Sequence, residues 1–206
     1  MKCILIGIFA FALTAQGLCG ITHASLITGH MTADDSFNFY ISTDDSIQGT
    51  LVGSGTDWTL PYTLVGTLTP GVVNYLHISA VNGNDNPPPR AGFVGDFSLT
   101  DTAFAFANGT QYQLTNNLDW SVSATGFGLA TSTPGVGSGY LTYTGGYDHA
   151  ATAIWLATQE NNQSAYFSTQ INPTPEPATY ILLSISLGAV GIARKQLIKR
   201  KQEQII

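Results

Sequence analysis

Apolar and polar residues alternate along the middle of the chain in a way that is typical of β-strands. Three stretches carry apolar side chains at every second position: Phe37, Phe39 and Ile41 in the first, Leu76, Ile78 and Ala80 in the second, Phe104 and Phe106 in the third. Runs rich in Gly, Pro, Asn and Asp separate the strands, for example "GSGTD", "NGNDNPPP" and "TPGVGSG". The region lacks a convincing helical spacing, so the pattern predicts an all-β domain over residues 25–171, an antiparallel β-sandwich or jelly roll.

The N-terminal segment has a different pattern. Lys2 precedes an apolar run over residues 4–13, and small residues follow at Thr22 and Ala24. A positive start, an apolar centre and a small-residue exit are typical of a secretory signal peptide, and the run is too short to span a membrane comfortably. We therefore expect residues 1–24 to form a signal-peptide helix that signal peptidase removes after Ala24.

Both cysteines of the chain, Cys3 and Cys19, lie in this segment. A lipoprotein signal acylated at Cys19 is an alternative, although Leu18 is bulky where that peptidase requires a small residue. Removal of the signal peptide would leave no thiol, which excludes a disulfide framework, a thiolate nucleophile and a Cys-ligated zinc site. A mature domain of this length must then be stabilised by its hydrophobic core.

The charge of the central region is strongly negative. Between Ser25 and Asn172 there are eleven acidic residues and a single basic one, Arg90, which gives a formal charge of −10. Such a surface repels the phosphate backbone of nucleic acids, so nucleic acid is excluded as an expected partner. Neutral glycans, basic polymers and divalent cations remain compatible with this charge.

The chain closes with an apolar segment and a basic cluster. Residues 178–193 are uncharged, and as a helix they are slightly short for a hydrocarbon core about 30 Å thick, which flanking residues or local thinning can accommodate. The basic residues that follow are Arg194, Lys195, Lys199, Arg200 and Lys201. Because positive charge stays on the cytoplasmic side, we expect a transmembrane helix with the ectodomain outside and residues 202–206 as a short cytoplasmic tail.

Pro175, Glu176 and Pro177 stand directly before this apolar segment. The ordered series of Pro-Glu-Pro, apolar helix and basic cluster over residues 172–201 resembles the PEP-CTERM sorting signal of Gram-negative bacteria. The resemblance implies anchoring in the inner membrane, removal of the tail near Pro-Glu-Pro by the membrane protease exosortase, and delivery to the cell surface or extracellular matrix. Family members are associated with exopolysaccharide and biofilm. An ordinary tail anchor is the alternative.

A second resemblance extends from Asp34 to about Phe127. The order of an acidic start, core strands, a turn glycine and a late Trp resembles the galactose-binding-like jelly roll of carbohydrate-binding modules and of accessory domains in glycosidases. The matching positions are Asp34, Asp35, Phe37, Tyr40, Trp58, Gly71, Leu76, Ile78, Trp120 and Val122. This resemblance implies a jelly-roll fold, and a fold of this kind does not by itself imply sugar binding.

Aromatic side chains are the first candidates for ligand binding, because a pyranose stacks its C–H face on an aromatic ring. We select Trp58, Tyr143 and Trp155 as candidate glycan-binding residues. The alternative is that the tryptophans are buried, since large aromatic side chains mostly pack in cores. We expect this for Trp120, and the sequence leaves Trp58 and Trp155 open.

Acidic residues in predicted turns suggest calcium as a possible cofactor. Asp34 and Asp44 flank one predicted strand, and Asp85 lies in an Asn-rich loop. Calcium binds six to eight oxygen ligands from carboxylates and carbonyls. The alternative is that these residues start turns by accepting hydrogen bonds from their own backbone.

The sequence contains no recognisable catalytic motif. Asp148 and His149 could belong to a Ser-His-Asp triad, but neither a Gly-x-Ser-x-Gly elbow nor an HExxH helix is present. We therefore expect a non-enzymatic, exported surface or matrix protein associated with exopolysaccharide. A glycan-binding domain is the alternative, and a glycosidase accessory domain or hydrolase is a weaker one.

Overall fold

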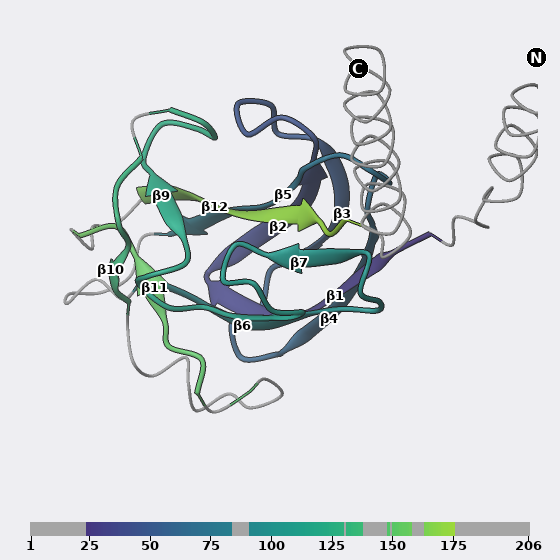
Figure 1. Cartoon of the computed structure of the whole chain (residues 1–206). Coiled ribbons are helices and arrows are strands. Elements are labelled where there is room, and N and C mark those ends of the chain that lie inside the picture. Colours follow the sequence, from purple (N-terminus) through teal and green to yellow (C-terminus); the bar gives the residue numbers. More distant parts are fainter. Residues whose placement is uncertain are drawn as a thin grey trace, which may run out of the picture.

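The computed structural model describes residues 24–83, 91–129, 131–137, 148, 150–157 and 163–175. This part of the chain is all-β, as predicted, and forms two antiparallel sheets packed face to face (Figure 1). The strands are β1 (Leu26–Asp34), β2 (Ser36–Ser42), β3 (Thr50–Gly55), β4 (Tyr62–Thr67), β5 (Asn74–Asn82), β6 (Gly92–Leu99), β7 (Phe104–Phe106), β8 (Tyr112–Leu114), β9 (Ser121–Ser123), β10 (Gly135–Val136), β11 (Ile154–Trp155) and β12 (Gln163–Pro173).

Each sheet is built around long central strands that are distant in sequence. The first sheet has the order β10-β11-β6-β1-β4, with β8 also pairing with β6. The second has the order β3-β2-β5-β12-β7, with β9 also pairing with β12. All pairings are antiparallel, which agrees with the β-sandwich expected from the alternation of apolar residues.

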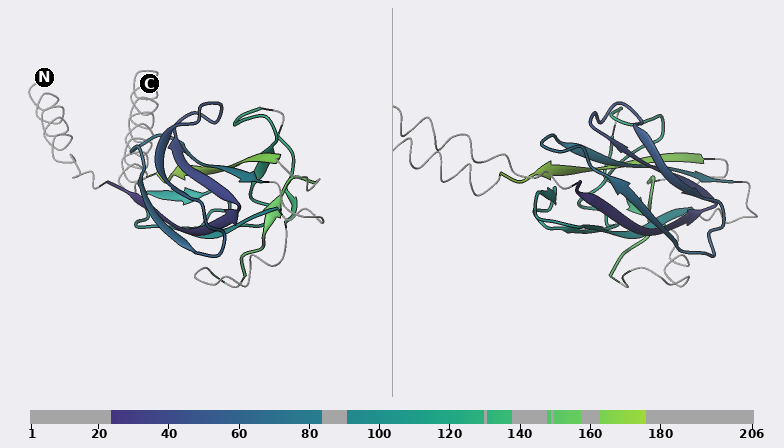
Figure 2. Two further views of the ribbon diagram at one scale, coloured as in Figure 1. Left: turned by 180° about the vertical axis from the view of Figure 1, so that it is seen from behind. Right: turned by 90° about the vertical axis from the view of Figure 1, so that its right-hand side faces the viewer.

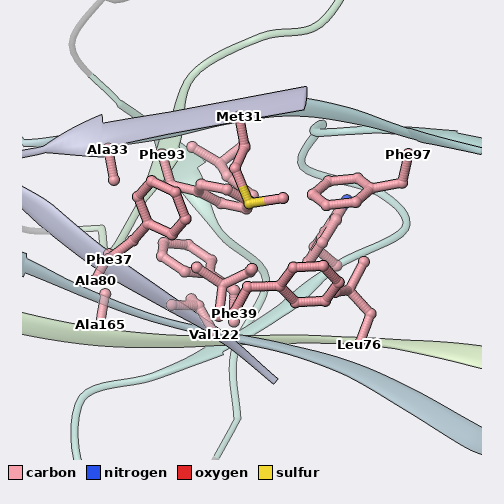
Figure 3. Close-up of a cluster of buried hydrophobic side chains, with 14 of the residues drawn as sticks. Met31, Ala33, Phe37, Phe39, Leu76, Ala80, Phe93, Phe97, Val122 and Ala165 are labelled. Carbon is pink, nitrogen blue, oxygen red and sulfur yellow. The ribbon is translucent and has the colours of Figure 1, made fainter. Parts of the chain in front are cut away.

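The core lies between the two sheets and is rich in aromatic side chains. The apolar residues at alternate positions of the three stretches are all buried, which confirms their predicted inward faces: Phe37, Phe39, Ile41, Leu76, Ile78, Ala80, Phe104 and Phe106. Met31, Phe93 and Phe97 from the first sheet face Phe39 and Leu76 from the second (Figure 3). Rings meet mainly in edge or tilted contacts, the favourable geometries for aromatic pairs.

Trp120 belongs to this core, as predicted. Its side chain is buried against the rings of Phe93 and Phe97, and its indole Nε1–H donates a hydrogen bond of 2.9 Å to the carbonyl oxygen of Leu114. Buried Trp N–H groups normally require such an acceptor. Trp120 is therefore a core residue whose polar group is satisfied by the backbone.

The two ends of the described chain meet on one loop. The backbone N–H of Leu26, at the start of β1, donates to Thr100 Oγ1 at 3.0 Å. The Thr174 N–H, just after β12, donates to the Ala103 carbonyl oxygen at 2.8 Å. Both ends thus emerge at the same end of the sandwich (Figure 2).

All strands of both sheets and the buried cluster lie within residues 24–175. A segment with a core of its own meets the main physical requirement for independent folding. Among the residues with described placement, no helix has the length and apolar character needed to cross a membrane. The transmembrane helix expected at residues 178–193 and the signal peptide up to residue 23 lie outside them.

Candidate functional site

The residues selected from the sequence for glycan binding do not form one site. Trp155, on β11, is fully buried, and its indole Nε1–H donates a 2.7 Å hydrogen bond to Gln163 Oε1. A ring without exposed surface cannot stack on a sugar, so the glycan-binding role given to Trp155 is corrected to a core role. Trp58 is half-buried and packs against a small cluster formed by Val94, Ala151 and Ala153, while Tyr143 lies outside the described residues.

The candidate calcium ligands are also separated. Asp34 is buried at the end of β1, just before β2, and Asp44 comes just after β2. The two carboxylates therefore lie at opposite ends of β2, roughly 20 Å apart. Asp34 and Asp44 therefore cannot bind the same ion. Asp85 lies outside the described residues, and within the described part of the chain no three His, Cys, Asp or Glu side chains are grouped to hold a metal.

Asp44 instead organises its own turn, as the alternative interpretation expected. Its Oδ1 accepts hydrogen bonds from the Ser46 hydroxyl at 2.7 Å and from the Ser46 backbone N–H at 2.8 Å. These bonds favour the ionised carboxylate and lower the pKa of Asp44 below its ordinary value, the side-chain bond contributing most. The carboxylate starts a turn in the manner of other Asp residues in loops.

A cleft of about 340 Å³ lies on the outer face of the second sheet. Tyr75 of β5 and Gln170 of β12 are opposite each other in the strand pairing, so their side chains share this face. Asp45, from the connection between β2 and β3, and Asp119, which precedes β9, contribute carboxylates to its walls. The cleft thus combines an aromatic ring with acidic and amide groups, and the described residues that line it include no basic side chain.

A buried polar network holds Asp45 in the wall of this cleft. His77 of β5 is fully buried, and its Nε2 lies 3.1 Å from Asp45 Oδ1. The Ser168 hydroxyl, opposite His77 on β12, donates to the same oxygen at 2.5 Å. The carboxylate is therefore positioned by two donors from the floor of the sheet.

The second ring nitrogen of His77 also faces an acceptor. Its Nδ1 lies 3.3 Å from the carbonyl oxygen of Gln48, so each ring nitrogen has a polar partner. The ring stacks on Phe127 with the centroids 4.1 Å apart and the planes at 8°. His77 thereby fastens the connection between β2 and β3 to the sheet.

Sequence reasoning missed this network because its members are distant along the chain. His77 and Asp45 are 32 residues apart, and Asp45 and Ser168 are 123 residues apart. The available signal was His77 itself, a polar residue between Leu76 and Ile78 on a strand whose other face is apolar. Its partners depend on the pairing of β5 with β12.

The rim of the cleft near Asp119 is held by local bonds. Asn116 Nδ2 donates to Asp119 Oδ2 at 2.8 Å, and the Thr169 hydroxyl donates to the Asp119 carbonyl oxygen at 2.9 Å. Leu118 stands on the same turn with 85 % of its surface exposed. This arrangement can accept hydrogen bonds from a hydroxyl-rich ligand and offers an apolar contact beside them.

A second polar cluster lies on the first sheet. His30 Nδ1 is 3.0 Å from Asp96 Oδ1, and Asp96 Oδ2 accepts the backbone N–H of Asp148 at 2.7 Å. The Tyr112 hydroxyl donates to Asp148 Oδ2 at 3.3 Å, and burial, followed by the charges of Asp96 and Asp148, raises the pKa of Tyr112 to about 12. Asp148 thus bonds to Tyr112 and its own turn, while its expected triad partner His149 lies outside the described residues.

The proposed sorting motif begins where the described chain ends. Pro175 is its last described residue, and Glu176, Pro177 and the basic cluster from Arg194 to Lys201 lie beyond it. No protein-family model matches this chain, and comparisons with curated proteins and with solved structures also find no match.

Proposed function

We propose that this protein is an exported, non-enzymatic component of the bacterial surface or extracellular matrix, sorted by a PEP-CTERM signal. Signal peptidase removes residues 1–24, the C-terminal helix holds the protein in the inner membrane, and exosortase acts near Pro175, Glu176 and Pro177. The protein then associates with exopolysaccharide. The ordered sequence elements at the two ends of the chain motivate this proposal.

The observation that carries the proposal is the position of the two chain ends. Leu26 and Thr174 both bond to the loop of residues 100–103, so the leader and the anchor join the domain at one end. A domain attached in this way directs its opposite end away from the membrane and leaves its outer sheet faces accessible at the sides. This geometry suits a protein that is first anchored and then displayed.

We further infer that the sandwich is a jelly roll. A jelly roll folds a long antiparallel ribbon over itself, so that of its eight strands the first pairs with the last, the second with the seventh, and so on. The eight strands can be taken in the order β11, β12, β1, β2, β3, β4, β5, β6. In this order the observed pairs are first with last (β11–β6), second with seventh (β12–β5), third with sixth (β1–β4) and fourth with fifth (β2–β3). The chain enters and leaves the described domain between the second and third strands of this order, where Leu26 and Thr174 both bond to the loop of residues 100–103.

The sorting step is tested with Glu176→Ala in a Gram-negative host that contains exosortase. We expect the variant to keep its tail and remain in the membrane fraction, whereas the wild-type chain loses mass at the C-terminus and reaches the surface. Glu203→Ala is the matched control, because it removes the other carboxylate of the C-terminal region. Equal processing of all three proteins, or an intact tail on surface material, would favour an ordinary tail anchor.

Glycan binding is the second candidate function, and the cleft on the second sheet favours it. Tyr75 supplies a ring beside the Gln170 amide, and the carboxylates of Asp45 and Asp119 are held as acceptors. The acidic cleft would select neutral, hydroxyl-rich polysaccharides over acidic ones. Trp58 remains a candidate contact elsewhere on the domain.

Binding is measured with residues 24–175 on a panel of bacterial polysaccharides, with calcium and with chelator. Tyr75→Ala should weaken binding by about tenfold, the effect of losing a contact worth about 1.4 kcal/mol. Tyr112→Ala is the control, because it removes a tyrosine from the opposite sheet. If the two variants bind with equal affinity, the glycan site does not lie in the cleft. Polysaccharide hydrolysis above that of a protein-free blank would support a hydrolase instead.

A further inference from the structure

Two six-residue strands form exposed sheet edges on the same side of the sandwich. Among the described strands, β4 pairs only with β1, and β3 pairs only with β2. The opposite edges end in much shorter strands, since β7 has three residues and β10 has two. Short edge strands limit pairing with another chain, whereas long ones invite it.

Of these two edges, β4 is the better template for another strand. β3 contains a register shift opposite Phe39 and Tyr40, and such bulges twist an edge away from a potential partner. β4 pairs with β1 from Tyr62 to Thr67 without a register shift. It also lacks the charged residues and prolines that usually protect an edge.

The outward side chains of β4 are suited to strand pairing. Thr63, Val65 and Thr67 alternate with inward residues and are all exposed, Val65 to 55 %. All three are β-branched, the class that packs best on a pleated sheet. They form an uncharged stripe along the edge.

A groove of about 520 Å³ borders this edge and leaves room for an added strand. Val65, Gly66 and Thr67 line one side, and the start of β3 with its preceding loop lines the other. Leu51 and Ile47 on that side are more than half exposed. An added strand would therefore pair with β4 through its backbone and contact apolar side chains across the groove.

Charge indicates which partner can approach. The region between the two signals has eleven acidic residues and one basic residue, so two copies repel each other over most of their surface. The β4 stripe is neutral, so neither paired strand carries a carboxylate, and Asp44 is the one acidic side chain among the described residues that line the groove. A second copy can thus dock here while its acidic residues stay in solvent.

We propose that β4 is a self-association edge, along which two copies of this chain pair antiparallel around a two-fold axis beside Val65. Residues directly opposite each other in an antiparallel pair have their side chains on the same face of the sheet, whereas consecutive residues of one strand lie on opposite faces. Under two-fold symmetry a residue can therefore face only itself or a residue an even number of positions away, so the axis passes beside a residue and not between two residues. Centring on Val65 pairs it with Val65 of the second copy, and pairs Thr63 with Thr67 of the second copy. The proposal is independent of glycan binding and of sorting.

The register is tested by cysteine cross-linking in residues 24–175, which contain no native cysteine. Cβ atoms of opposite residues lie about 4.5–5.5 Å apart, close to the distance that a disulfide spans after a small adjustment. Val65→Cys should oxidise rapidly to a covalent dimer. Thr63→Cys alone should not, whereas a mixture of Thr63→Cys and Thr67→Cys should.

Leu118→Cys is the control for random collision, because Leu118 is even more exposed but lies on a turn. Cross-linking of Val65→Cys no faster than Leu118→Cys would overturn the proposal. Rapid self-linking of Thr63→Cys would overturn the register. Neither outcome depends on a change in folding, since both positions are exposed.

Sedimentation of the same segment over a range of concentrations provides the second measurement. We expect a monomer–dimer equilibrium that shifts toward dimer as salt screens the acidic surfaces. Val65→Lys should weaken dimerisation at least about tenfold, the usual effect of a charge on an edge strand, and Leu118→Lys should not. A wild-type segment that stays monomeric at every concentration and salt level, or equal effects of the two lysines, would refute self-association through β4.

Discussion

Replacing Trp155 tests whether this ring serves the core or a ligand. The side chain has no exposed surface, its ring packs against Phe167 at a centroid distance of 5.7 Å, and its N–H bonds to Gln163. Trp155→Ala removes the packing and leaves a cavity, and such changes cost about 3–5 kcal/mol. Domains of this size have a free energy of unfolding of about 5–15 kcal/mol, so the variant should fold but be much less stable.

The assay is urea denaturation of residues 24–175 followed by circular dichroism, since the mutation removes a fluorophore. A loss of about 4 kcal/mol corresponds to a fall in Tm of about 10 °C for a chain of this length. Trp155→Phe is the milder variant, and it should cost about 1–3 kcal/mol through the lost hydrogen bond and the smaller ring. The two values follow from the burial of the ring and from its hydrogen bond to Gln163.

Trp58→Ala is the matched control, because Trp58 is only half-buried at the edge of a small cluster. It should cost clearly less than Trp155→Ala. If Trp155→Ala cost less than about 1 kcal/mol, or if it abolished polysaccharide binding without changing stability, the assignment of Trp155 to the core would be refuted.

Three further predictions follow from the same structure. His77→Phe keeps an aromatic ring beside Phe127 but removes the two ring nitrogens and their contacts with Asp45 and Gln48. The free energy of unfolding should fall by about 1–3 kcal/mol and proteases should cut faster near Asp45, as measured by denaturation and limited proteolysis. Gly95→Ala should cost about 1–3 kcal/mol in the same denaturation assay, because a Cβ there would lie 2.7 Å from the carbonyl oxygen of His30, and unchanged stability would contradict this packing. The pKa of Tyr112 is about 12 in the folded protein and about 10 in the unfolded chain, so the unfolded chain loses this proton first as pH rises. The free energy of unfolding should therefore fall between pH about 10 and about 12. Tyr112→Phe cannot ionise, and its denaturation curves should lack this part of the pH dependence.

The sequence by itself determined which residues face the core. Side chains alternate between the two faces of a strand, so Phe37, Phe39 and Ile41 could be assigned to one face from local spacing alone. The same local rule explains the turn at Asp44, whose hydrogen bonds reach only two residues along the chain. The strongly acidic character of the domain also followed directly from composition.

Only the tertiary structure decided how the strands are ordered and which polar residues meet. Trp58 and Trp155 look alike in sequence, but the pairing of β11 with β6 buries Trp155 in the sandwich, while Trp58 stays half-exposed in a turn. The contact of His77 with Asp45 and Ser168, and the free edge of β4, likewise depend on strand pairings between distant parts of the chain. Local periodicity sets the faces of a strand but does not specify its neighbours, because pairing depends on contacts that are formed only when the whole core assembles.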